Sequence, residues 1–289
     1  MVHMRSRDTS RVALAQPKPQ NQMVQLVKYV KRAHLDDAKL ILFPEGYLPS
    51  YTDDSALSIE DETVRSIKKL SSEYGLSIAT GIKEKIGKSL FLSLFLFSEG
   101  EIAAIHRKVF LAEFEKPVFN ARKFGFNSDD VFPVVAISGI GKVGCLLCYE
   151  NLFPETHRLL RYKGAEIVLG PFGFGMRSKS FDYRESWLCE LRSRSMENKM
   201  YIVSATNAIG EGLMGIVIDP VGRVLVNEDS EGYKSCSVDL SYLRDLRAGL
   251  GDEVAPRELK INISRISPLM YRILHSESIA FRKRSPNDE

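Results

Sequence analysis

Four side chains that can do chemistry stand where apolar runs of the sequence end, or in the loops that follow: Glu45, Lys108, Glu115 and Cys148. Sheets of α/β proteins present their working side chains at such places. A thiol is a strong nucleophile once its proton is removed, and a carboxylate can act as the base. A lysine ammonium can stabilise both a thiolate and an oxyanion. These residue types together indicate nucleophilic catalysis by a thiol.

Each of these residues also has an ordinary structural interpretation. Glu45 follows the apolar run LILFP, where partial burial would raise its pKa toward that of a general base, but a surface turn also accommodates a glutamate. Lys108 in HRKVF would equally suit the exposed, charged end of a hairpin. Cys148 would equally serve as a small buried hydrophobe, which is the commoner role of cysteine.

The spacing Cys145-x-x-Cys148 raises two other hypotheses, a redox pair and half of a zinc site. Side chains alternate along a strand, so positions three apart face opposite sides, and no second pair of metal-binding residues completes a zinc site. Cys189 and Cys236 are isolated, and we interpret both as structural. None of the five histidines forms a recognisable nucleophile pair with Cys148, so the sequence gives no support for a Cys-His mechanism.

Apolar runs and amphipathic runs alternate along the chain, which predicts an α/β fold. The predicted strands cover residues 11–16, 38–43, 76–81, 89–97, 102–110, 131–137, 142–147, 165–170 and 201–206, with a further hairpin over 213–226. The predicted helices cover residues 21–33, 62–74, 154–164 and 183–199. We expect one domain over 11–255, a flexible tail over 1–10, and a C-terminal extension over 256–289 that packs on the body or on a partner subunit.

Composition excludes several classes of protein. The 289 residues include 40 Lys plus Arg and 37 Asp plus Glu, and the net charge of +3 forms no basic stripe for nucleic acid. The longest nearly apolar stretch, residues 90–97, is far shorter than the roughly 20 residues of a membrane-spanning helix. The N-terminus is polar and basic without an apolar run, so we expect a cytosolic protein that binds no membrane.

The segments around the candidate residues resemble those of the nitrilase superfamily of carbon-nitrogen hydrolases. LILFPE ends at Glu45, HRKVFL contains Lys108 and GCLLCYENLFPE contains Cys148, and the superfamily has a triad of Glu, Lys and Cys in this chain order. The likeness continues through KGAEIVLGP, LRSRSMEN and the Asp219-Pro-x-Gly222 turn, and covers roughly residues 11–239. It implies a four-layer α-β-β-α sandwich that forms homodimers or larger homo-oligomers.

The resemblance also implies roles for these residues. Glu45 would be the general base, Cys148 the nucleophile and Lys108 the cation that holds the tetrahedral oxyanion, with the backbone N–H of Tyr149 as a second donor. No metal or organic cofactor is implied. A further glutamate after the lysine positions substrate or assists proton transfer in many members. In this chain Glu115 is the first candidate for that role, and Glu113 in the same run, HRKVFLAEFEK, is its rival.

The loop that holds Phe172, Gly173 and Phe174 aligns with the loop that lines the superfamily's pocket. Two interpretations stay open, substrate binding and a glycine-rich turn with core aromatics. If the loop lines the pocket, the two rings favour a partly apolar acyl group, and Arg177 or Lys179 could meet a carboxylate.

Departures from the superfamily's pattern leave the substrate open. Residues 119–123 lack a Pro-Gly step that is common there, and residues 215–217 lack a serine. Glu150 stands where many small-amide hydrolases have Asp, as in some nitrilases and in the membrane-embedded apolipoprotein N-acyltransferases. We expect a thiol hydrolase that releases ammonia from a small amide or N-carbamoyl compound. A nitrilase, an acyl or amide transferase and a non-catalytic scaffolding member are the alternatives.

Overall fold

The structure is a computed structural model that describes residues 8–49, 54–122, 131–178, 180 and 182–248. Two six-stranded sheets form, with strand orders β12-β1-β2-β3-β4-β5 and β11-β10-β9-β8-β7-β6. The strands of the first sheet are β1 (Thr9–Gln16), β2 (Leu40–Leu42), β3 (Ser77–Ile86), β4 (Ser89–Ser98), β5 (Glu101–Arg107) and β12 (Gly232–Asp239). Those of the second are β6 (Val134–Ile137), β7 (Gly141–Cys145), β8 (Ile167–Leu169), β9 (Tyr201–Ser204), β10 (Gly215–Ile218) and β11 (Val224–Glu228).

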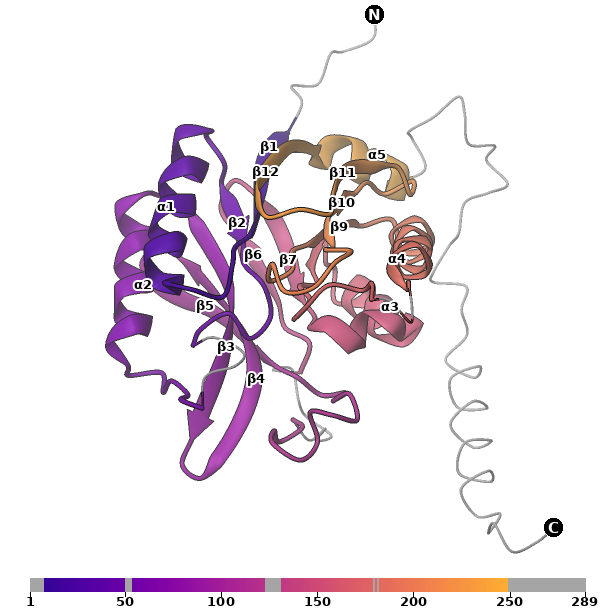
Figure 1. Cartoon of the computed structure of the whole chain (residues 1–289). Helices are drawn as coiled ribbons and strands as arrows, with labels where there is room; N and C mark the ends of the chain where they lie inside the picture. The colour runs from indigo at the N-terminus through magenta and orange to yellow at the C-terminus, as the bar shows by residue number, and fades with distance from the viewer. Residues whose placement is uncertain (1–7, 50–53, 123–130, 179, 181, 249–289) are drawn as a thin grey trace, which may run out of the picture. The chain divides into compact units, whose positions relative to one another are not determined.

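Helices cover the outer face of each sheet. Figure 1 shows α1 (Gln22–Leu35) and α2 (Glu62–Glu73) on one side, and α3 (Pro154–Tyr162) and α4 (Arg184–Asn198) on the other. In α1 the buried residues Leu26, Tyr29, Val30 and Ala33 recur at helical spacing and pack on the first sheet. A short 3-10 helix, η1 (Cys148–Leu152), precedes α3, and α5 (Leu240–Ala248) ends the described chain.

Three apolar layers hold these elements together. The central layer contains side chains of both sheets, including Leu42 and Leu94 of the first and Val143 and Val203 of the second. Each outer layer joins the other face of one sheet to its own helices. The alternation of faces along the strands thus produces the four-layer α-β-β-α sandwich that the sequence predicts, and the structure confirms that fold.

Differences from the predicted elements concern the ends of strands and the last part of the chain. β1 begins at Thr9, two residues earlier than predicted, and β3 runs to Ile86 because it pairs with β4 from Ile78 to Ile86. Neither β12 nor α5 is predicted, since GYKSCSVD in β12 has no clear apolar period. The register of β12 is fixed by antiparallel pairing with β1, from Thr9 with Asp239 to Gln16 with Gly232. The predicted extension over 256–289 lies outside the described residues.

No helix among the described residues is long and apolar enough to cross a membrane.

Gly81 in β3 permits a close approach of two backbone segments. A Cβ atom at this position would lie 2.3 Å from the carbonyl oxygen of Pro44 and 2.5 Å from Cα of Glu45. The N–H of Gly81 also donates to the Pro44 carbonyl at 2.9 Å. The backbone that carries Glu45 therefore rests directly on β3 at a residue without a side chain.

We predict that Gly81→Ala costs about 3 kcal/mol of the free energy of unfolding, because its methyl group meets backbone that cannot move aside. Gly139→Ala is the control, since a Cβ there meets no atom within 4 Å and the cost of its φ of +69° is about 1 kcal/mol. Urea denaturation of both variants measures the difference. Equal destabilisation by the two substitutions would contradict the close approach at Gly81.

Candidate active site

The first sheet supplies Glu45 and Lys108 at one edge. β2 is parallel to β3, and β5 runs in that same direction because β4 is antiparallel to both of its neighbours. Glu45 follows the end of β2, and Lys108 directly follows the end of β5. The carboxyl ends of these strands bring together two residues that are far apart in the sequence.

A buried lysine lies between two buried carboxylates. Nζ of Lys108 donates to Oε1 of Glu45 at 2.7 Å and to Oε1 of Glu115 at 2.7 Å, and the three side chains are at most 1% exposed. The N–H of Ala112 donates to the other oxygen of Glu115 at 2.7 Å, which fixes that carboxylate. Glu113 is 88% exposed and pairs with Lys116 at the surface. Of the two rival glutamates, Glu115 is the one that lies beside Lys108.

The second sheet supplies Cys148, which follows β7 and begins η1. Its φ of 43° is unusual for a residue with a side chain and costs of order 1–3 kcal/mol. Its N–H donates to the carbonyl of Pro171 at 2.8 Å. The Cys148 side chain interacts with the Glu45 carboxyl and with the backbone N–H of Gly173. The left-handed backbone thus directs the thiol toward the charged cluster of the first sheet.

The two cysteines of the C-x-x-C segment lie in different apolar layers. Cys145 belongs to the central layer between the sheets, and Cys148 packs in the outer layer of the second sheet. Both are free thiols. Side chains continue to alternate after β7, since Cys145 and Leu147 lie in the central layer and Leu146 and Cys148 in the outer one, as predicted for positions three apart on extended backbone.

Asn207 joins the loops that carry these groups. Its side-chain NH₂ donates to the backbone carbonyls of Glu45 at 2.8 Å and of Gly173 at 2.9 Å, and the residue is 1% exposed. The N–H of Glu45 also donates to the carbonyl of Phe172 at 3.3 Å. Asn207 is not among the residues predicted from the sequence, although it directly follows the predicted strand 201–206. A position just after a predicted strand is the same signal that indicated Glu45, and it could have indicated Asn207.

Burial governs the protonation of the site. Desolvation raises the pKa of Glu45 to about 7, although the Lys108 charge acts in the opposite direction. Burial opposes the charge of Lys108, but Glu45, Cys148 and Glu115 together raise the pKa of this ammonium above its ordinary value. Burial, with the Glu45 charge beside it, also raises the pKa of the Cys148 thiol. The resting site therefore holds a neutral thiol, a permanent cation and a carboxyl group that can take up a proton near neutral pH.

The predicted substrate-binding residues differ in their positions. The ring of Phe172 is fully buried against Trp187 with ring centroids 4.8 Å apart, which agrees with the core interpretation. Gly173 contributes its N–H beside the Cys148 thiol, and Phe174 packs on Phe114 with centroids 5.7 Å apart. Of these three residues, Gly173 is therefore the one whose backbone N–H interacts with the Cys148 thiol.

The structure describes two of the other predicted groups, Tyr149 and Arg177. Tyr149 is the second residue of η1, so its N–H belongs to a first helical turn, where N–H groups have no acceptor within the helix. Arg177 donates to Asp182 at 2.6 Å and is therefore already paired with a carboxylate. Lys179 lies outside the described residues.

The sequence matches the model of one family over most of its length. Residues 11–248 match the carbon-nitrogen hydrolase family. The chain belongs to this family. The nitrilase superfamily named from the sequence motifs is thereby confirmed.

Curated relatives of this carbon-nitrogen hydrolase include enzymes named for two reactions. An (R)-stereoselective amidase of Pseudomonas sp is 27% identical over 257 residues, which cover 79% of this chain and 89% of the relative. A nitrilase of Pyrococcus abyssi is 27% identical over 236 residues, which cover 76% of this chain and 84% of the relative. Among solved structures, a carbon-nitrogen hydrolase of Helicobacter pylori superposes with a TM-score of 0.72 at 19% identity over 92% of this chain and 98% of the other. The last likeness shows a shared fold.

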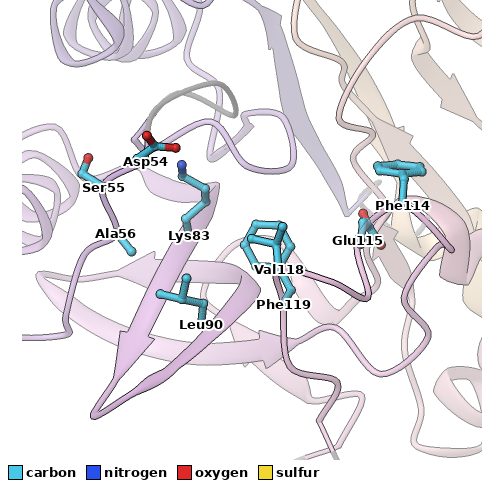
Figure 2. Close-up of a pocket in the computed structure, with 9 residues that line it drawn as sticks. All are labelled: Asp54, Ser55, Ala56, Lys83, Leu90, Phe114, Glu115, Val118 and Phe119. Atoms are coloured by element: carbon cyan, nitrogen blue, oxygen red, sulfur yellow. The ribbon is translucent and has the colours of Figure 1, made fainter.

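A cavity of about 230 Å³ adjoins the charged cluster of the hydrolase at Glu115. Figure 2 shows Asp54, Ser55 and Ala56 on one side of this pocket and Phe114 and Glu115 on the other. The pocket is lined by Asp54, Ser55, Ala56, Lys83, Leu90, Phe114, Glu115, Val118 and Phe119. Most of its exposed surface is apolar, and its size suits a small organic molecule.

We predict that Lys108→Met lowers the free energy of unfolding by about 3–5 kcal/mol, because two carboxylates lose the buried ammonium between them. The Lys108 charge lowers the Glu45 pKa, so its removal raises that pKa further above its value in the unfolded chain. When folding raises the pKa of a carboxyl group, the free energy of unfolding of the protein decreases as pH rises toward that pKa. The deficit of the variant should therefore widen as pH rises through about 7.

Urea denaturation at about pH 6 and about pH 8.5 measures this deficit. Lys116→Met is the matched control, because Lys116 pairs with Glu113 at the surface, where ion pairs contribute little. A deficit that stays constant between the two pH values would contradict the burial of the charged cluster.

Proposed function

We propose that this carbon-nitrogen hydrolase cleaves the C–N bond of a small amide or N-carbamoyl compound through a thioester on Cys148, and releases ammonia. The observation that carries this proposal is the convergence of four groups from two sheets. A neutral thiol lies beside Glu45, a carboxyl group whose pKa is about 7, and Lys108 holds Glu45 and Glu115 at 2.7 Å each.

The first half of the reaction forms the acyl-enzyme. Sγ of Cys148 attacks the amide carbon while the Glu45 carboxylate takes the thiol proton. The negative charge on the substrate oxygen is met by the Lys108 ammonium and by the N–H of Tyr149. The C–N bond then breaks, the leaving nitrogen takes the proton from Glu45, and ammonia departs from a thioester.

The second half reverses these roles with water. Glu45 removes a proton from a water molecule as its oxygen attacks the thioester carbon, and Lys108 again stabilises the oxyanion. The thiolate leaves and regains its proton from Glu45, so the carboxylic acid departs and the enzyme returns to its starting state. Glu115, fixed by the N–H of Ala112, holds Lys108 in place in both halves. No step requires a metal or an organic cofactor.

A nitrilase is the second candidate, because the Pyrococcus abyssi relative carries that name. Attack of the same thiol on a nitrile carbon gives a thioimidate; one water molecule converts it to the thioester with loss of ammonia, and a second water molecule releases the acid and the thiol. Turnover of a nitrile compared with that of its amide separates the two reactions. A transferase would pass the same acyl group to an amine such as hydroxylamine. The cytosolic location and the homo-oligomeric state stay predictions from the sequence.

We predict that purified protein releases ammonia from at least one member of a panel of monocarboxylic amides, ω-amides of dicarboxylates, N-carbamoyl amines, N-carbamoyl amino acids and nitriles. Cys148→Ala should release none, because the variant has lost the thiol that forms the thioester. Cys145→Ala is the matched control and should keep most of the activity, since its thiol lies in the central apolar layer. Coupled ammonia assays and circular dichroism measure turnover and folding.

Activity retained by Cys148→Ala would remove the central proposal. Loss of activity in folded Cys145→Ala, equal to the loss in Cys148→Ala, would point to a paired thiol mechanism instead.

A further inference from the structure

Another buried carboxylate, Glu150, lies two residues after Cys148, and the proposed reaction does not use it. Its Oε2 accepts hydrogen bonds from Nε2 of His106 at 2.6 Å and from the N–H of Leu147 at 2.8 Å. Its Oε1 accepts from the N–H of Val109 at 2.6 Å. Both Glu150 and His106 are completely buried. A carboxylate that accepts this many bonds in the interior is tightly fixed.

The partners of Glu150 lie on both sides of Lys108. His106 is the penultimate residue of β5 and its side chain shares a strand face with Lys108, whereas Val109 directly follows the lysine. The ring of His106 stacks on Phe132 with centroids 5.1 Å apart, which limits its rotation. Glu150 therefore fixes the His106 side chain before Lys108 and the backbone N–H of Val109 after it.

The hydrogen bond from the N–H of Leu147 to Glu150 lies next to the nucleophile. Leu147 directly precedes Cys148, whose φ of 43° is the strained turn that begins η1. Because Glu150 belongs to η1 and accepts from Leu147, it closes this turn as an N-terminal capping side chain does. One carboxylate thus connects the end of β5 in the first sheet with the strained turn after β7 in the second.

We propose that Glu150 and His106 are positioning residues that set the distance between the Lys108 ammonium and the Cys148 thiol. The inference rests on the proposed function of those two groups. Glu150 carries negative charge, since its pKa is lowered: burial acts against ionisation, and the His106 side chain and backbone N–H groups outweigh it. A shorter or uncharged side chain at this position would release one sheet from the other at the site of catalysis.

A purely structural carboxylate that also binds a side chain of β5 provides the comparison. Glu84 of β3 binds Arg107 of β5 through both oxygens at 2.7 Å, and it accepts from Ser93 at 2.7 Å. Its side chain is 2% exposed. Arg107 lies between His106 and Lys108 in the sequence and therefore faces the opposite side of the sheet. Glu84→Gln removes a buried charge bound to β5 without touching the connection to Cys148.

The experiment compares Glu150→Gln, Glu150→Asp, His106→Leu and His106→Gln with Glu84→Gln. Three quantities are measured: kcat and KM on a substrate found in the panel, the rate at which iodoacetamide alkylates Cys148 as followed by peptide mass, and the melting temperature. Iodoacetamide reports the reactivity of the thiol whether or not a substrate has been found.

We expect Glu150→Gln and His106→Leu to lower kcat about tenfold or more, with KM within about twofold, because a misplaced cation costs transition-state stabilisation. Alkylation of Cys148 should slow about fivefold in the same variants. The side chain in Glu150→Asp is shorter and holds fewer of these contacts at once. Its kcat and alkylation rate should therefore lie between those of these variants and those of wild type. His106→Gln keeps a donor near the position of Nε2 and should restore most of the loss. Glu84→Gln should lower the melting temperature and leave kcat and alkylation near wild type.

Losses of kcat in Glu150→Gln and Glu150→Asp no greater than that of Glu84→Gln would overturn the inference, as would wild-type alkylation of Cys148 in both. If Glu150→Gln does not fold, the aspartate variant and the His106 pair decide the question in the same way. Failure of the proposed function has a different signature, since the wild-type protein would then hydrolyse no member of the panel. In that case the alkylation rates would still show whether the variants change the environment of the Cys148 thiol.

Discussion

The buried ammonium of Lys108 between two carboxylates is the constraint on which the site depends. A charge removed from water is tolerated only where opposite charges and hydrogen bonds replace its hydration. Glu45 and Glu115 do this at 2.7 Å each, and Glu45 and Lys108 can meet because β2 and β5 run in the same direction and end at the same edge of the first sheet. The order of strands in the first sheet is therefore a condition for the chemistry.

The same burial explains why the thiol needs a base. In an apolar layer with carboxylates nearby, the Cys148 thiol keeps its proton, and desolvation gives Glu45 a pKa at which it can accept that proton and return it. The second sheet contributes the proposed nucleophile, Cys148, on a strained turn, and Asn207 and Glu150 attach that sheet to the first. The site lies where two sheets meet, so its geometry depends on contacts between segments that are distant in the sequence.

Much of this arrangement could be predicted from the sequence, and the reasons for the exceptions are physical. The triad candidates follow apolar runs with recognisable ends, and the alternation of side chains over residues 145–148 separates Cys145 from Cys148. The choice between Glu113 and Glu115 depends on the path of a loop, which has no period. The roles of His106 and Asn207 depend on contacts across the sheets, and β12 is held by pairing with β1 and carries a weak pattern of its own. Phe172 shows that a pocket-loop motif can place its ring in the core.

The most direct test of the account is to trap the acyl-enzyme. Protein mixed with an amide substrate of the panel is quenched in acid within one turnover, digested and mapped by mass spectrometry. The account predicts that the peptide with Cys148 gains the mass of the substrate less ammonia, and that hydroxylamine removes this mass, as expected for a thioester. Turnover with no adduct on Cys148, or with the adduct on Cys145, Cys189 or Cys236, would contradict it.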